Sequence, residues 1–346
     1  MATVTRSKKS CTVNPLKMSQ PIGGALAFLG LNNCMPVLHG SQGCTAFGLV
    51  LFVRHFREAI PLQTTAMNEA TTIMGGFDNI EQAILNISNR TKPEIIGICS
   101  TGLTETKGDD VDGYLKLIRA RHPELENVAI VYVSTPDYQH AFQDGWSKTV
   151  ARIITELAEP AVVKQETRIN ILPGSHLMPG DIEELREIVE AFGFQPIVLP
   201  DLSGSLDGHV PDDFSPTTLG GTTLADIRAT GAAALTLAVG EQMRPACEAL
   251  QAKTGVPYEL FDRLTGLGAS DRLFALLARL SGRPVPNKYR RQRSQLVDAM
   301  LDGHFFFGGK KIALGAEPDL LWSIGAWLAE MGAEITVAVT PTASPL

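Results

Sequence analysis

Two kinds of apolar segment alternate along the chain and together predict an α/β protein. Segments 94–100 and 128–133 are almost continuously apolar, which is typical of strands buried on both faces of a parallel sheet. Other segments, such as 78–87 and 181–192, carry apolar residues at helical spacing. Strands that alternate with helices in this way favour parallel strands joined by crossover helices. We therefore predict repeated Rossmann-like domains with mostly parallel sheets flanked by helices.

The alternation restarts twice, which divides the chain into an arm and three predicted domains. Residues 1–20 are polar and are expected to form an N-terminal arm. The predicted domains cover 21–160, 161–305 and 306–346, and a linker is expected over 159–166. One strand–helix–strand unit cannot build a covered sheet by itself. We therefore expect the third domain to be incomplete, with most of it beyond residue 346.

Three local predictions concern the first domain. Apolar residues crowd all faces of a predicted helix that begins near Cys44, so we expect it to be largely buried until Arg54, where its end reaches the surface. Asp78 is expected to cap the next helix. Residues 101–110 follow the apolar run 94–100 and are expected to form a polar loop. Binding sites in α/β proteins favour such loops at the carboxyl ends of strands.

Composition and charge then narrow the class of protein. Of the 346 residues, 44% are hydrophobic and 19% charged, as in an ordinary globular protein. The formal net charge of −7 gives no general attraction for nucleic acid or anionic membranes, so neither is expected as a partner. The N-terminus lacks the apolar core of a signal peptide, and no run is long enough to span a bilayer. Five scattered cysteines fit a reducing compartment, and we expect the cytoplasm.

The candidate chemistry is concentrated in the segment His39-Gly-Ser-Gln-Gly-Cys44. Cys44 is expected in the first turn of a helix, where unpaired N–H groups and the helix dipole favour a thiolate. Gly40 and Gly43, on either side of Ser41, lack a Cβ, so the backbone is free to adopt unusual angles and a bulky group can approach. The alternative interpretation is that Cys44 is a small buried hydrophobe, as lone cysteines usually are.

Several standard motifs are missing from the sequence. There is no phosphate-binding P-loop, dinucleotide fingerprint, nucleophile elbow, His-Glu-x-x-His or Cys-x-x-Cys. If Cys44 binds an iron–sulfur cluster, the other ligands must therefore come from distant positions or from another chain. Cys99 is the first candidate within this chain, although a core thiol is the favoured interpretation there. The remaining cysteines have weaker claims: Cys11 in the arm, Cys34 before a strand and Cys247 in a helix.

The Cys44 loop and the following Arg-His-Phe-Arg-Glu closely resemble the β-type subunits of the nitrogenase molybdenum–iron protein family. The resemblance spans essentially the whole chain, including segments 20–25 and 105–110. In that family the catalytic β subunit supplies three cysteines to the P-cluster. The resemblance aligns two of those positions with Ser19 and Gly102, so that only Cys44 is retained. Cys99 lies three residues before the third position, and no ligand role is transferred to it.

This loss of two cysteines resembles the NifN-type cofactor-assembly subfamily, as do segments 61–67 and 100–106. The resemblance implies an α2β2 heterotetramer with an α-type cofactor-assembly subunit. Cys44 and three cysteines of that partner would hold a [4Fe–4S] cluster at the interface. Gly40, Ser41 and Gly43 would form the loop around this cluster.

The resemblance also implies a function in building the iron–molybdenum cofactor. The complex would receive an iron–sulfur precursor from a delivering protein and hold it mainly in the α-type partner. It would support insertion of molybdenum and homocitrate with the nitrogenase iron protein, and then pass the product to apo-nitrogenase. No residue of this chain is expected to be catalytic, which favours a scaffold over an enzyme. Two alternatives stay open: a catalytic β-type subunit of nitrogenase or protochlorophyllide reductase, and a plain interaction module.

Overall fold

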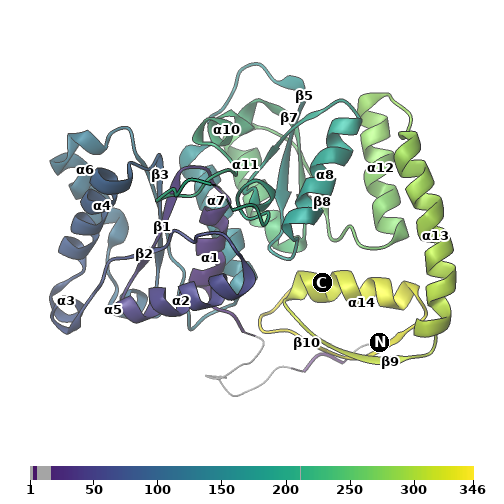
Figure 1. Cartoon of the computed structure of the whole chain (residues 1–346), viewed down its shortest axis with the longest axis horizontal. Coiled ribbons are helices and arrows are strands. Elements are labelled where there is room, and N and C mark those ends of the chain that lie inside the picture. The colour runs from purple at the N-terminus through teal and green to yellow at the C-terminus, as the bar shows by residue number, and fades with distance from the viewer. Residues whose placement is uncertain (1–2, 6–16, 211) are drawn as a thin grey trace.

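The computed structural model describes residues 3–5, 17–210 and 212–346. The predicted arm over residues 1–20 falls mostly outside this part of the chain, as does Cys11. The described residues form two four-stranded sheets and one two-stranded sheet, each flanked by helices (Figure 1). Every paired strand runs parallel to its neighbour. The prediction of an α/β fold with parallel sheets is therefore confirmed.

The first sheet has the strand order β2-β1-β3-β4. Every residue of β1 and β3 is buried, as their continuous apolar runs predict. Cys34 was expected before the strand but is the first residue of β1, because it pairs in register with Ile95. The strands are β1 (Cys34–His39), β2 (Gln63–Thr64), β3 (Ile95–Ser100) and β4 (Ala129–Val133).

Helices cover both faces of this sheet. Two of them pack on one face and two on the other, where they separate the first sheet from the second (Figure 1). The prediction that Asp78 caps its helix is wrong, because the helix begins two residues earlier than predicted and Gly76 occupies the N-cap. These helices are α4 (Phe77–Thr91) and α6 (Val111–Arg121) on the outer face, and α1 (Gln20–Leu29) and α7 (Phe142–Leu157) on the inner face.

Three shorter or exposed elements lie at the carboxyl edge of the first sheet: α2 (Gln42–His55), α3 (Glu69–Met74) and α5 (Gly102–Lys107). The prediction of a polar loop after β3 is wrong in part, because helix α5 forms there. At the start of α5 the Thr101 N–H donates a hydrogen bond to the Thr104 hydroxyl. A 3₁₀ turn, Pro123–Leu125, precedes β4.

The prediction that α2 is largely buried is wrong. Only Thr45, Gly48 and Phe52 of its residues are buried. Phe47 is 76% exposed and Val53 is 58% exposed, because no described element covers the outer side of α2. The apolar pattern of this helix therefore leaves an apolar surface.

The second sheet repeats the arrangement of the first, with the strand order β6-β5-β7-β8. Helix α7 also packs against α11, so both sheets share it. The predicted linker is too long, because Gln165 and Glu166 already belong to β5. The elements are β5 (Gln165–Pro173), α8 (Pro179–Ala191), β6 (Gln195–Val198), α9 (Leu202–Ser205), α10 (Leu224–Ala229), β7 (Ala233–Val239), α11 (Arg244–Thr254) and β8 (Tyr258–Phe261), with 3₁₀ turns at Thr230–Ala232 and Glu241–Met243.

Backbone contacts join the first two sheets. Thr218 reaches from the segment before α10 to the start of β1, where its hydroxyl accepts from the Cys34 N–H at 2.7 Å and lies within hydrogen-bond distance of the Leu31 carbonyl. The Thr222 N–H donates to the Gly30 carbonyl at 2.9 Å. One continuous apolar core runs through both units. The predicted domain boundaries stay a prediction.

The last part of the chain contains two long helices and a small unit. The two strands of this unit are parallel and α14 packs on one face of them. Among the described residues, no helix combines the length and the apolar character that crossing a bilayer would require. The elements are α12 (Leu267–Ser281), α13 (Asn287–Phe307), β9 (Lys311–Gly315), α14 (Pro318–Glu330) and β10 (Glu334–Val339).

Candidate functional site at the carboxyl ends of β1 and β3

The strand order of the first sheet makes the end of β1 a topological switch point. From β1 the chain moves to β2 on one side and later to β3 on the other. Connections leaving such a switch point diverge, and ligands of open α/β sheets bind in the resulting crevice. His39 and Ser100, the last residues of β1 and β3, are paired in register. The Cys44 loop and the segment 101–110 therefore start side by side.

Cys44 lies in the first turn of α2. Its thiol is free and half-buried, and its Sγ lies 3.6 Å from the Ser41 hydroxyl oxygen. Gln42 and Gly43, which precede it, are exposed. The thiol is thus accessible from outside the chain and faces the partial positive charge of a helix N-terminus. This placement fits a ligand better than it fits an inert core thiol.

The two glycines of the loop have different functions. Neither has a positive φ, so the expected unusual backbone angles are wrong for both. A Cβ on Gly40 would lie 2.3 Å from the Thr101 hydroxyl oxygen, so Gly40 is needed for close packing of the two loops. A Cβ on Gly43 would have only the Ser41 hydroxyl oxygen within 4 Å, at 3.8 Å. Gly43 therefore leaves open space beside Cys44.

The other described cysteines are core thiols. Cys34, Cys99 and Cys247 are buried, and burial raises the pKa of Cys99 and of Cys247 to about 12. Burial also raises the pKa of Cys34. In the described part of the chain, no three histidine, cysteine or acidic side chains come together as a metal site. Cys44 fits one ligand of a cluster, and the remaining ligands would have to come from outside these residues.

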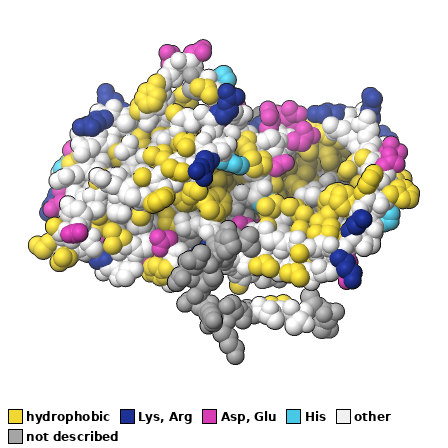
Figure 2. Space-filling model, turned by 60° about the horizontal axis from the view of Figure 1, so that its bottom comes forward, with side chains coloured by type: hydrophobic (Ala, Val, Ile, Leu, Met, Phe, Trp, Pro, Cys, Tyr) yellow, Lys and Arg dark blue, Asp and Glu magenta, His cyan; other side chains and the backbone are white. Residues whose placement is uncertain are grey.

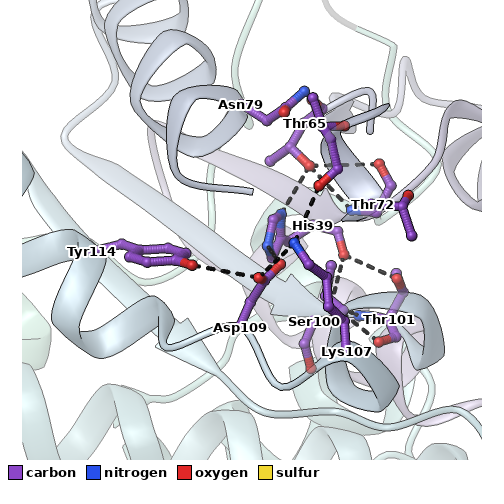
Figure 3. Close-up of polar contacts among 12 residues, drawn as sticks. His39, Thr65, Thr72, Asn79, Ser100, Thr101, Lys107, Asp109 and Tyr114 are labelled. Atoms are coloured by element: carbon purple, nitrogen blue, oxygen red, sulfur yellow. Dashed lines mark hydrogen bonds and ion pairs between the residues drawn. The ribbon is translucent and has the colours of Figure 1, made fainter. Parts of the chain in front are cut away.

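A buried polar network lies directly behind the Cys44 loop and is centred on His39 (Figure 3). The Nδ1 atom of His39 lies 2.9 Å from the Thr65 hydroxyl oxygen, and Nε2 lies 3.4 Å from Oδ2 of Asp109. Lys107 Nζ contacts the other oxygen of Asp109 at 3.0 Å. Burial lowers the pKa of His39 to about 4, and the Asp109 carboxylate opposes this shift without reversing it. The imidazole is therefore neutral at neutral pH.

The same network holds the backbone at the start of the loop. The Thr65 hydroxyl accepts from the Gly40 N–H at 3.1 Å. The carbonyl of His39 accepts from the hydroxyls of Thr101 and Thr104, at 2.9 and 3.1 Å. Sequence reasoning missed His39 and Asp109 as a pair. The available signal was a histidine that ends one buried strand and an acidic pair that follows the next.

The exposed face of α2 continues the surface around Cys44. Figure 2, in which the lower edge of Figure 1 faces forward, shows hydrophobic side chains among few charged ones over the region of α2. The exposed large hydrophobic residues of this helix are Phe47, Val50, Leu51 and Val53. A contiguous apolar surface of this kind marks an interaction site in proteins that are otherwise well packed.

Comparison with known proteins first assigns the chain to a protein family. Residues 19–345 match the model of the family described as Nitrogenase component 1 type Oxidoreductase, and the chain belongs to this family. A structure titled "Nitrogenase Cp1 at pH 6.5" superimposes with a TM-score of 0.92 at 32% identity, covering 99% of this chain and 74% of that one.

Two relatives are similar over nearly the whole chain. Both are named nitrogenase iron-molybdenum cofactor biosynthesis protein NifN. The protein from Bradyrhizobium diazoefficiens is 60% identical, with 99% of this chain and 74% of the relative covered. The protein from a Nostoc species is 54% identical, with 100% of this chain and 78% of the relative covered. The resemblance to the NifN-type subfamily is therefore confirmed.

Proposed function

We propose that this chain is the β-type subunit of the complex on which the iron–molybdenum cofactor of nitrogenase is assembled. The observation that carries the proposal is Cys44, which among the described cysteines is the one that is not fully buried, at the switch point of a chain so similar to NifN proteins. In this function the chain supports maturation of a precursor with molybdenum and homocitrate and its transfer to apo-nitrogenase. It works as a scaffold, and the expected compartment is the cytoplasm.

Cys44 is proposed as the chain's one ligand to a [4Fe–4S] cluster, with Gly40, Ser41 and Gly43 forming the loop around it. A cubane held by four thiolates carries net negative charge, which the N-terminus of α2 and nearby N–H groups offset. Open space at Gly43 permits the approach of a bulky inorganic group. When bound, the cluster would supply one-electron transfer chemistry.

The remaining ligands are proposed to come from an α-type partner in an α2β2 heterotetramer. The apolar outer face of α2, next to Cys44, suits such a permanent contact because a stable interface needs an apolar centre. The precursor is proposed to lie mainly in that partner. The nitrogenase iron protein, a precursor-delivering protein and apo-nitrogenase are the further partners of this function.

The test is to purify the complex with its α-type partner and compare Cys44→Ala with Cys247→Ala. Both changes remove one thiol, but Cys247 is buried in the second unit. We expect Cys44→Ala to lose the electron paramagnetic resonance signal of the cluster and about four irons per site, the content of one cubane. Cys247→Ala should retain both. An unchanged signal in Cys44→Ala would contradict the proposal.

The catalytic alternative requires further cysteine ligands from this chain. A Cβ on Gly102 would lie 2.1 Å from Oδ1 of Asp137, so a cysteine there would displace that side chain. This geometry disfavours a standard P-cluster. Assays of dinitrogen and acetylene reduction on the purified complex distinguish the two functions. Turnover at the rate of nitrogenase, together with a full P-cluster, would refute the scaffold.

A further inference from the structure

We propose that Asp109, His39 and Thr65 form a buried relay of one ion-pair contact and two hydrogen bonds that positions the Cys44 loop. The relay begins at the Asp109 carboxylate and ends at the backbone N–H of Gly40, where the loop begins. It makes Asp109 and His39 positioning residues for the thiol. Only the consequences of the relay at a bound cluster rest on the proposed function. The position of the Cys44 thiol can also be tested in the chain alone.

The chemistry of the groups determines where the proton lies in each contact of the relay. A carboxylate accepts only, so the single proton of the neutral His39 ring lies on Nε2, which faces Asp109. Nδ1 is then an acceptor and takes the hydroxyl proton of Thr65. The Thr65 oxygen in turn accepts from the Gly40 N–H. Asp109 thus determines the tautomer of His39, and the tautomer determines how Thr65 holds Gly40.

The carboxylate at the start of the relay is itself held in place. Its side chain is 3% exposed, and Lys107 supplies a compensating positive charge at 3.0 Å. The Tyr114 hydroxyl donates to the same carboxylate at 3.4 Å. Lys107 also donates to the Thr71 carbonyl at 3.1 Å, which ties α5 to α3. A buried carboxylate with these partners has little freedom to move away from His39.

The contact between His39 and Asp109 joins two buried polar atoms. Nε2 of His39 and Oδ2 of Asp109 are buried, and among the described residues neither atom makes a hydrogen bond, so the 3.4 Å ion-pair contact between them is the link at this end of the relay. Removing the imidazole would leave Oδ2 of Asp109 buried without its contact from His39, while Lys107 and Tyr114 would still contact Oδ1. An unsatisfied buried polar atom is more costly than a lost exposed hydrogen bond.

The end of the relay holds the loop where a small displacement matters. The Gly40 carbonyl accepts from the Met67 N–H at 2.9 Å while its N–H is held by Thr65. Gly40 also packs against Thr101 without room for a Cβ. Cys44 follows only four residues later and its N–H donates to the Ser41 carbonyl. A shift at Gly40 is therefore carried to the thiol through a short, hydrogen-bonded turn.

The first test measures the rate at which iodoacetamide alkylates Cys44 in the chain without denaturant, by peptide mapping. Thr65→Val removes the hydroxyl at nearly constant volume, and Thr65→Ser keeps it. We expect Thr65→Val and Asp109→Asn to change the rate about fivefold, the effect of one net hydrogen bond. Thr65→Ser should stay within about twofold of the unchanged protein, because it retains the hydrogen bond.

The matched control is Asp201→Asn, which changes another nearly buried carboxylate, one that pairs with Arg186 in the second unit. It should leave the Cys44 rate unchanged. The buried thiols of Cys34 and Cys99 report global opening in the same samples. An unaltered Cys44 rate in Thr65→Val and Asp109→Asn overturns the proposal. So does a parallel rise at all three cysteines, because the relay would then only stabilise the fold.

The second test uses the complex with the α-type partner. If Cys44 binds a cluster, Asp109→Asn should shift its midpoint potential and g-values while the iron content stays constant, and Asp201→Asn should not. Unshifted values with an altered alkylation rate would overturn the consequence at the cluster. Failure of the proposed function is recognised separately, by a cluster that survives Cys44→Ala, and the alkylation test stands in that case.

Discussion

The two four-stranded sheets have the same topology, yet their switch points are used differently. In the first sheet the switch point at the ends of β1 and β3 is followed by a partly exposed loop with a half-buried thiol. In the second sheet the equivalent ends of β5 and β7 are covered by the N-terminus of α14 from the third unit. The same strand order therefore provides an open site in one place and an internal contact in the other.

The covered switch point is closed by acidic side chains. Asp319 is 1% exposed and accepts from the Gln242 N–H at 3.1 Å, while its own N–H donates to Gln143 at 3.3 Å. Burial raises the pKa of Asp319 to about 6 and that of Glu317 to about 7. His176, which follows β5, has its pKa lowered to about 4 by burial. The two switch points therefore differ in whether another part of the chain covers them.

The largest effect is expected from Gly240→Ala at the covered switch point. Gly240 has φ +101°, and a Cβ there would lie 2.5 Å from Oδ2 of Asp319. Backbone strain and overpacking together should lower the free energy of unfolding by about 4 kcal/mol. Urea denaturation measures this change. A loss below about 1 kcal/mol would mean that α14 does not press on this loop.

The next largest effect is expected on the pH dependence of stability in Asp319→Asn. Because the folded-state pKa of Asp319 is about 6 rather than 3.8, the folded chain binds more protons between these values than the unfolded chain does. Its contribution to stability is therefore lost as pH rises through this range, by about 3 kcal/mol. The Asn variant lacks this loss.

The measurement for Asp319→Asn is the free energy of unfolding at pH 4, 5, 6 and 7 for both proteins. Taking the difference between them cancels the opposite trend of His176, whose lowered pKa makes stability rise with pH. As pH rises, the free energy of unfolding of Asp319→Asn should increase relative to that of the unchanged protein. Parallel profiles would contradict a buried, protonated Asp319.

A smaller effect is expected at the open switch point from Phe47→Ser. Phe47 is 76% exposed, so the stability of the isolated chain should change by less than about 0.5 kcal/mol. If the α2 face binds the α-type partner, affinity should fall about 30-fold, as for an aromatic residue at the centre of an interface. Titration of the purified subunits measures it. Unchanged affinity would place the interface elsewhere.

The smallest effect is expected from Gly43→Ala in the exposed first turn of α2. A methyl group here meets only the Ser41 hydroxyl, at an ordinary contact distance of 3.8 Å. Unfolding free energy should change by less than about 0.5 kcal/mol. Urea denaturation beside Gly240→Ala gives the direct comparison of the two switch points. If Gly43→Ala lowered the free energy of unfolding as much as Gly240→Ala does, the proposed difference between the two switch points would be wrong.

Much of the fold could be predicted because strands buried on both faces leave a clear pattern. The runs that form β3 and β4 are almost continuously apolar, and helix α8 follows its predicted range closely. Helix α2 could not be predicted correctly, because an apolar face that awaits a partner has the same pattern as one that faces the core. Helix α5 has only six residues, most of them polar or small, and forms through hydrogen bonds at its start.

The candidate site could be predicted only in part. Cys44 was identified from its loop and from the family resemblance, and its own motif places it at a helix start. The pairing of His39 with Asp109 joins residues 70 positions apart and depends on the register of β1 with β3. No local pattern records that register. The opposite functions of Gly40 and Gly43 likewise depend on which loop lies beside each of them.

The contact between Thr218 and Cys34 bears on how this protein can be divided for laboratory work. A cut near residue 160 would look natural from the alternation of strands and helices. It would remove the hydroxyl that accepts from the Cys34 N–H and expose the core that the two units share. Proteolytic nicking or separate expression of the first unit should therefore yield an insoluble piece rather than a smaller working module. The first unit, which carries Cys44, therefore cannot be separated from the second unit.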